Sequence, residues 1–156
     1  MAGKHGLDSR FLANSSLLTG LEQGQVDELV ELARVVRLDD GQAAVEQGTV
    51  GESIFLLHSG AIAVTTHDGG GGEVVLAVLA EPGSFFGEMA LVDPGPRSAT
   101  VRAQGRAVLL ELSLEALERY FARHPEARVV ILRNIARVLA RRLRDANVRV
   151  ASARTM

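Results

Sequence analysis

The central part of the chain, residues 37–111, consists of short β-type runs that are closed by glycine or by polar turns. Larger apolar residues recur at alternate positions, at Ile62 and Val64 and again at Val74, Leu76 and Val78, as expected for strands with one buried face. Turn residues recur roughly every 8–12 positions, and HDGGGG at 67–72 is typical of a hairpin connection. This pattern predicts a small, mainly β fold, either a sandwich or a barrel.

Helical periodicity flanks this β region on both sides. Residues 17–36 space their leucines and valines three to five positions apart, which predicts an amphipathic helix. Ser113 is a suitable N-cap for a second helix, and Pro125 suits the first turn of a third. We therefore expect one domain over 1–156, with an N-terminal segment 1–16, a helix 17–36, a β-barrel 37–112 and C-terminal helices 113–150.

The composition excludes several classes of protein. A chain of 156 residues that is 47% hydrophobic suits a single packed domain. Because it contains no cysteine, disulfides, Cys-ligated zinc and thiol catalysis are excluded. No stretch approaches the roughly 18 apolar residues of a membrane span, and the N-terminus lacks a signal-peptide core. We expect a reduced, cytoplasmic, soluble domain.

The last helix combines an apolar repeat with a strong positive charge. Between Arg128 and Met156 there are eight arginines and one acid, a formal charge of +7, which leaves −9 for the rest of a chain of net charge −2. Two interpretations stay open for its heptad-like seam: packing on the chain's own barrel, or contact between two copies. The arginines are expected to form a solvated face, although an anionic partner stays open. The seam residues are Leu132, Ala136, Leu139, Leu143, Ala146 and Val150.

One segment, residues 82–100, departs from the strand-and-turn texture and carries the chemistry. Amide groups in a short helical turn at 88–92 and at Ser98–Ala99 would form a concave site for an anion. Arg97 offers a planar fork of donors for phosphate or carboxylate, whereas Glu88 would accept hydrogen bonds from sugar hydroxyls. These groups together predict a nucleotide pocket. The alternative is a Glu88–Arg97 ion pair that braces an ordinary loop.

The stretch FGEMALVDPGPRSATVRA, residues 86–103, resembles the phosphate-binding cassette of cyclic nucleotide-binding domains. The glycines at positions 41, 48, 51, 60 and 83 resemble that family's framework of barrel turns, and the resemblance covers roughly 17–150. It implies a mainly β fold with flanking α-helices. More closely, it implies a small double-stranded β-helix, or jelly-roll, barrel with an N-terminal helix and C-terminal lid and dimer helices.

The resemblance also implies roles for individual residues. Arg97 would bind the exocyclic oxygens of a cyclic phosphate, and Glu88 would accept from the ribose 2′-hydroxyl. Backbone amides would complete the anion site, apolar side chains would contact the base and sugar, and the last helix would bring Asn147, Arg144 or Arg149 to the base. The implied ligand-binding residues are Gly87, Glu88, Met89, Ala90, Arg97, Ser98, Ala99, Val64, Ala77 and Asn147.

The implied ligand is a cyclic mononucleotide, cAMP or cGMP, with cAMP favoured. Ser98 does not decide the base, because members that use cAMP also carry serine at this position. We expect a regulatory sensor that binds no metal, forms a homodimer through the Leu132–Val150 helix and acts on an unidentified effector protein. A chain of 156 residues has room for the sensor and its lid, but none for a DNA-binding domain.

Two other classes of function can be weighed against this one. An enzyme or a metal-binding cupin is not expected, because the four histidines form no His-x-His pair and the serines lack a nearby base. A degenerate cyclic-nucleotide fold that binds nothing could still serve as a dimerisation or docking module. The intact Glu88 and Arg97 count against this alternative.

Overall fold

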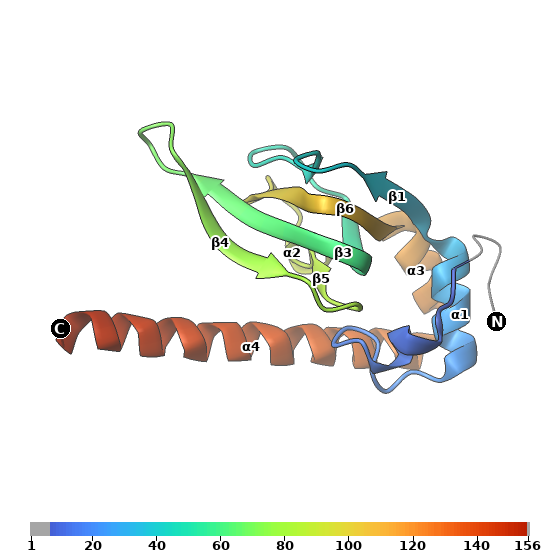
Figure 1. Cartoon of the computed structure of the whole chain (residues 1–156). Coiled ribbons are helices and arrows are strands. Elements are labelled where there is room, and N and C mark those ends of the chain that lie inside the picture. The colour runs from blue at the N-terminus through green and yellow to red at the C-terminus, as the bar shows by residue number, and fades with distance from the viewer. Residues whose placement is uncertain (1–6, 156) are drawn as a thin grey trace.

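The computed structural model describes residues 7–155, a bent antiparallel sheet flanked by helices at both ends of the chain (Figure 1). Residues 1–6 of the expected N-terminal segment and Met156 lie outside the described residues. The elements, in chain order, are the 3-10 helix η1 (Arg10–Asn14), α1 (Gln23–Leu32), β1 (Arg34–Leu38), β2 (Ala43–Val45), β3 (Ser53–His67), β4 (Glu73–Leu79), β5 (Phe85–Phe86), α2 (Met89–Val92), β6 (Thr100–Ser113), α3 (Leu114–Arg123) and α4 (Pro125–Thr155). The predicted mainly β fold with flanking helices is confirmed.

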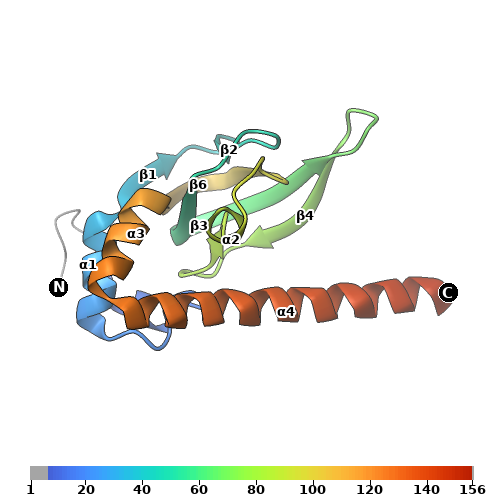
Figure 2. The ribbon, with the colours of Figure 1, turned by 180° about the vertical axis from the view of Figure 1, so that it is seen from behind.

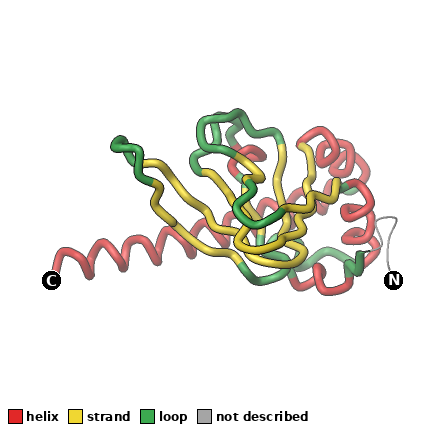
Figure 3. The backbone as a smooth tube through the Cα atoms, turned by 45° about the horizontal axis from the view of Figure 1, so that its top comes forward, coloured by secondary structure: helices red, strands yellow, loops and turns green. Residues whose placement is uncertain are grey.

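Strands β3 and β6 form the long antiparallel ladder to which every other strand attaches. Their pairing runs from Ser53–Ser113 to Thr65–Thr100, β1 and β2 pair with β6, and β4 and β5 pair with β3. Gly60 lets β3 bend within this ladder, since its φ is 86° and a Cβ there would lie 2.2 Å from the carbonyl oxygen of Arg106. Figure 3 shows the strands curving around one another in the resulting barrel.

The same two strands are buried on both faces, which creates two connected cores. On β3, Ile54 and Leu56 belong to the core beneath the helices, whereas Phe55 and Leu57 belong to the core inside the barrel. Alternate side chains of a strand point to opposite faces, so a continuous apolar run can serve both cores. Full burial of each such side chain contributes about 1.5–3 kcal/mol. Packing on both faces therefore stabilises the ladder.

The predicted helix over 17–36 is wrong at both ends. Residues 16–20 form turns, and Gly20 has a φ of 98°, which ends any helical path before α1 begins at Gln23. Beyond Leu32 the chain is extended, because the β-branched pair Val35–Val36 joins β6 opposite Leu110 and Leu109. Leucines at three-to-five spacing pack equally well in a turn, so periodicity alone overestimated the helix.

Helices α3 and α4 follow the expected signals at their starts. The Oγ of Ser113 accepts a hydrogen bond from the amide of Ala116 at 3.1 Å, and α4 begins at Pro125. The first half of α4 packs on the core through Ile131, Ile135 and Val138. The predicted seam lies on a neighbouring stripe and stays largely open, with Leu143 62% and Val150 57% exposed. The last turns of α4 extend beyond the barrel (Figure 2).

Strand β4 differs from the expected half-buried strand. Its apolar residues are exposed on both faces, with Val75 at 57%, Leu76 at 56% and Val78 at 50%. β4 pairs with β3 alone and forms the edge of the sheet. The β3–β4 hairpin projects away from the barrel on the side where α4 extends (Figure 1). Alternation in the sequence therefore indicated a strand but not a covered face.

Asn134 links α4 to the turn that precedes α1 through two hydrogen bonds. Its buried Nδ2 donates to the carbonyl oxygens of Leu17 at 2.7 Å and Thr19 at 2.9 Å. Asn134→Ala should lower the free energy of unfolding by about 1–3 kcal/mol, because two carbonyls lose their donor. Urea denaturation measures this change. Arg133→Ala, at an exposed neighbouring position, is the control, and an equal loss in both variants would contradict the assignment.

Candidate ligand-binding site

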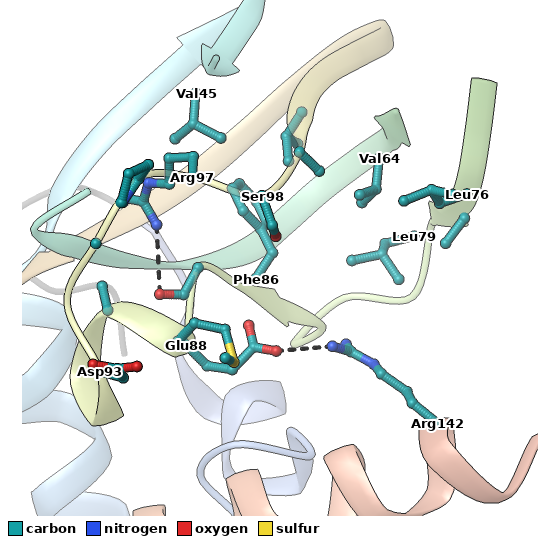
Figure 4. A pocket seen from close by; sticks show the side chains of 18 of the residues that line it. Val45, Val64, Leu76, Leu79, Phe86, Glu88, Asp93, Arg97, Ser98 and Arg142 are labelled. Atoms are coloured by element: carbon teal, nitrogen blue, oxygen red, sulfur yellow. Dashed lines mark hydrogen bonds and ion pairs between the residues drawn. The ribbon is translucent and has the colours of Figure 1, made fainter. Parts of the chain in front are cut away.

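A cavity of about 660 Å³ opens between the 87–99 segment, strands β3 and β4, and helix α4 (Figure 4). This volume lies within the range of small-molecule sites, roughly 300–1,000 Å³. Leu76 and Leu79 of β4 form an apolar wall, and the charged residues of the lining are Glu88, Asp93, Arg97 and Arg142. The complete lining is Val45, Val64, Leu76, Ala77, Leu79, Phe86, Gly87, Glu88, Met89, Ala90, Asp93, Pro94, Gly95, Pro96, Arg97, Ser98, Ala99, Val101 and Arg142.

The turn from β5 into α2 is anchored by a buried residue at each end and has a glycine between them. Phe86 lies in the barrel core and Ala90 is buried, which anchors both ends of the turn. Gly87 between them has a φ of 83°, and a Cβ there would lie 2.6 Å from Nη1 of Arg97. The predicted short helical turn is present as α2. The amide of Ala90 donates to the carbonyl of Gly87 at 3.2 Å, so a ligand would share this donor.

Arg97 is half-buried and held by main-chain oxygens. Its Nη2 donates to the carbonyl of Ser53 at 3.0 Å, Nη1 lies 3.5 Å from that of Gly87, and the guanidinium sits 5.8 Å from the ring centroid of Phe55. Burial lowers the pKa of Arg97, while the negative charges of Glu111 and Glu88 oppose this effect. An arginine pKa starts so high that the group remains charged. The guanidinium has five N–H donors, so these contacts leave capacity for an anion.

Glu88 is buried and pairs with a residue of the last helix. Its Oε1 accepts from Nη1 of Arg142 at 2.9 Å, and the guanidinium of Arg142 also lies 5.8 Å from the ring centroid of Phe85. The Glu88 side chain is only 7% exposed, whereas that of Arg142 is 47% exposed. The alternative of a Glu88–Arg97 brace is therefore wrong for this structure, since each residue has its own partner.

Arg142 is one of the site residues that the sequence analysis missed. It follows Val138, which is on the buried face of α4, by four residues, and this spacing was the available signal. The sequence analysis did not single out Arg142, because it is one of eight arginines in the last 29 residues and most of these are exposed to solvent. Its position makes α4 one wall of the cavity and connects this helix directly to the 87–99 segment.

The structure gathers nine of the ten predicted site residues around one cavity. Val64 and Ala77 of the β3–β4 pair line the same cavity as Met89, Ser98 and Ala99. Asn147 is exposed and is not part of this lining. It follows Arg142 by five residues, which turns its side chain about 140° around the helix axis. Arg144 and Arg149 are exposed as well, so the expected contact from this part of α4 is not present in the single chain.

Two further kinds of site, a metal centre and a membrane span, were considered for residues 7–155. Between residues 7 and 155, no group of three or more histidines or carboxylates comes together as a candidate metal site. His58 packs edge-on against Phe11, with ring centroids 5.3 Å apart, and lies outside the cavity lining. Within the same part of the chain, no helix combines the length and the apolar character that crossing a bilayer requires.

The fold and cavity together define a class: small β-barrel domains that hold a ligand between the barrel and a C-terminal helix. Comparison with known proteins agrees with this class. The family described as "Cyclic nucleotide-binding domain" matches residues 35–124. The chain belongs to the cyclic nucleotide-binding domain family. The resemblance of the 86–103 segment to this family is thereby confirmed.

Individual relatives show how far the similarity extends. The "CRP-like cAMP-activated global transcriptional regulator" of Mycobacterium tuberculosis is 32% identical over 90% of this chain and 61% of its own length. The "Glutaminase 2" of Bradyrhizobium diazoefficiens is 37% identical over 92% of this chain, but over only 22% of the glutaminase. The chain thus spans between a fifth and three fifths of these relatives, and their whole activities are not carried over to it.

Comparison with solved structures also finds regulatory proteins that resemble this chain over most of its length. The Thermus thermophilus catabolite activator protein has a TM-score of 0.76 and 34% identity over 88% of this chain and 62% of its own. The N-terminal domain of a transcriptional regulator from Streptomyces coelicolor A3(2) has a TM-score of 0.74 and 32% identity, covering 86% of this chain and 93% of that one.

The Arg142–Glu88 pair leads to a prediction about stability. Arg142→Ala should lower the free energy of unfolding by about 1–2 kcal/mol, because the buried carboxylate loses its charged donor while half-exposure of the arginine limits the effect. A double-mutant cycle with Glu88→Gln, followed by urea denaturation, should give a coupling energy of about 1 kcal/mol. Arg141→Ala is the matched control on the exposed face. A loss equal to that control, with no coupling, would refute the pair.

Proposed function

We propose that this chain is a regulatory sensor that binds a cyclic mononucleotide in the cavity between the barrel and α4, and that it is not an enzyme. Arg97 binds the exocyclic phosphate oxygens, and Glu88 accepts from the ribose 2′-hydroxyl. The observation that carries the proposal is the convergence of both residues on one cavity of about 660 Å³. The cytoplasmic location expected from the sequence belongs to the same proposal.

The charges of the site fit this assignment. Arg97 faces the cavity next to the 87–99 segment, where an anion would replace long or shared contacts with strong charge-assisted hydrogen bonds. Glu88 would repel an anion on its own, but it lies beside Arg142, which compensates its charge at 2.9 Å. The apolar wall of Val64, Leu76 and Leu79 offers a surface for a base. Phosphate, sugar and base thus each have a matching part of the cavity.

The ligand that we favour is cAMP, with cGMP as the competitor. Several relatives are named for cAMP, including the "cAMP-dependent protein kinase regulatory subunit" of Mucor circinelloides, which is 36% identical over 70% of this chain and 25% of its own length. Ser98 lies in the lining but does not distinguish the two bases. The wall of the cavity is mainly apolar, so it supports a purine without selecting its edge.

Signalling would proceed as a shift between two arrangements of α4. A ribose hydroxyl that binds Glu88 competes with, or joins, the Arg142 contact, and this contact is a direct polar link from α4 to the 87–99 segment. A ligand changes the helix equilibrium only through such differential contacts. The proposed output is a change in the position of the C-terminal helices, which an unidentified effector protein reads.

The ligand test compares Arg97→Ala with wild-type protein. Calorimetry should show saturable binding of cAMP to wild-type protein, weaker binding of cGMP, and a loss of about 100-fold or more in Arg97→Ala, which removes charge-assisted hydrogen bonds to phosphate. Arg106→Ala, at an exposed position of β6, serves as the matched control. If folded wild-type protein shows no binding at millimolar nucleotide, the alternative of a degenerate, non-binding docking module is correct.

We also propose that a second copy of this chain covers the seam of α4. Leu139 of the seam packs partly against the core, whereas Leu132, Leu143 and Val150 are 37%, 62% and 57% exposed. Apolar residues of strand β4 are exposed as well, among them Val75, Leu76 and Val78. Large exposed apolar patches typically mark interfaces. Asn147 lies nearer to this seam than to the cavity of its own chain.

Light scattering after size exclusion tests the homodimer. Wild-type protein should elute with the mass of two chains at micromolar concentration, and Leu143→Glu should give one chain, because it places a charge in the apolar seam. Val148→Glu is the control: Val148 is 64% exposed, but it is turned about 140° away from Leu143 around the helix. A single-chain mass for wild-type protein, or equal disruption by both variants, would rule out this interface.

A further inference from the structure

The guanidinium of Arg97 lies between two cavities rather than at the edge of one. The first is the proposed ligand site, and the second, of about 360 Å³, lies on the other side of the arginine. Gly51, Ser53 and Glu111 are among the residues that line the second cavity. Besides Gly87 of the ligand site, residues that do not line this site therefore contribute to the position of the arginine.

Gly51 leaves the space that this side chain occupies. A Cβ on Gly51 would lie 2.0 Å from Nε and 2.1 Å from Cζ of Arg97, well inside van der Waals contact. Gly51 is buried, and it is not among the glycines with positive φ. The backbone at this position would thus accept alanine without strain. The requirement for glycine comes from the guanidinium that lies against it.

The same loop also fixes the backbone of Arg97. The amide of Arg97 donates to the carbonyl of Thr49 at 2.7 Å, and the amide of Gly48 donates to the carbonyl of Arg97 at 2.8 Å. The side chain then passes over Gly51 to reach the carbonyl of Ser53. Loop 48–51 therefore holds the arginine at both its main chain and its guanidinium.

We propose that Gly51 is a positioning residue for Arg97: its missing side chain provides a flat surface, here called the arginine seat, on which the guanidinium rests while it faces the phosphate position. This inference rests on the proposed role of Arg97 in binding the phosphate. Any side chain at position 51 displaces the guanidinium from the carbonyls of Ser53 and Gly87. Phosphate affinity is then lost although Arg97 is still present.

Gly51→Ala tests the seat when it is titrated with cAMP and, separately, with adenosine, which lacks the phosphate. The expected result is a loss of about tenfold or more in cAMP affinity, with adenosine binding unchanged from wild-type protein. Gly24→Ala is the matched control, because a Cβ on Gly24 meets no atom within 4 Å, and its cAMP affinity should stay at the wild-type level. Wild-type cAMP affinity in Gly51→Ala, together with loss in Arg97→Ala, would overturn the seat and leave the proposed function standing. Wild-type affinity in Arg97→Ala would instead refute the proposed function.

If Gly51→Ala is less stable than wild-type protein, thermal unfolding shows whether the loss arises through Arg97 or from the backbone at position 51. Removing the arginine removes the steric conflict, so Gly51→Ala should lower the melting temperature in the wild-type background but not in the Arg97→Ala background. This non-additivity is specific to a residue that acts through Arg97. An equal loss in both backgrounds would mean that the backbone needs glycine at position 51, and it would overturn the proposal.

Discussion

The ladder between β3 and β6 is the interaction on which the rest of the structure depends. Both strands are buried on both faces, so their side chains alternate between the core beneath the helices and the core of the barrel. A shift of one residue in this register would exchange the two sets of side chains. The ladder therefore fixes where Ser53 presents its carbonyl to Arg97, and where Phe55 supports both the guanidinium and the neighbouring Phe86.

Arg97 and Glu88 of the site do not form an ion pair with each other, because each has a different partner. Arg97 is held by main-chain carbonyls, whereas Glu88 pairs with Arg142 from α4. A direct Glu88–Arg97 pair would have closed the cavity and satisfied both groups internally. Separate partners leave a cation and a hydrogen-bond acceptor facing one space. They also make α4 part of the site, which is the physical basis for coupling occupancy of the cavity to the position of the helix.

The fold was predictable from the sequence where local signals and burial agreed. Glycine-closed β runs, the Ser113 cap and Pro125 placed the barrel and the last two helices correctly. The helix at 17–36 was overestimated, because leucine spacing does not distinguish a helix from a turn packed on the same core. The open faces of β4 were not predictable either, since alternation shows that a strand has two faces and says nothing of what covers them.

The sequence by itself determined the family, the barrel and the cassette with Glu88 and Arg97, because short-range motifs and glycine positions encode these features locally. Only the tertiary structure decided which partner each charge has. Arg142 lies 54 residues from Glu88 and Gly51 lies 46 residues from Arg97, and neither pairing leaves a trace in local spacing. The near-neutral count of 17 basic and 19 acidic residues likewise conceals which few of them meet across the fold. Contacts of this kind arise from packing between distant segments, so they appear only when the chain is folded.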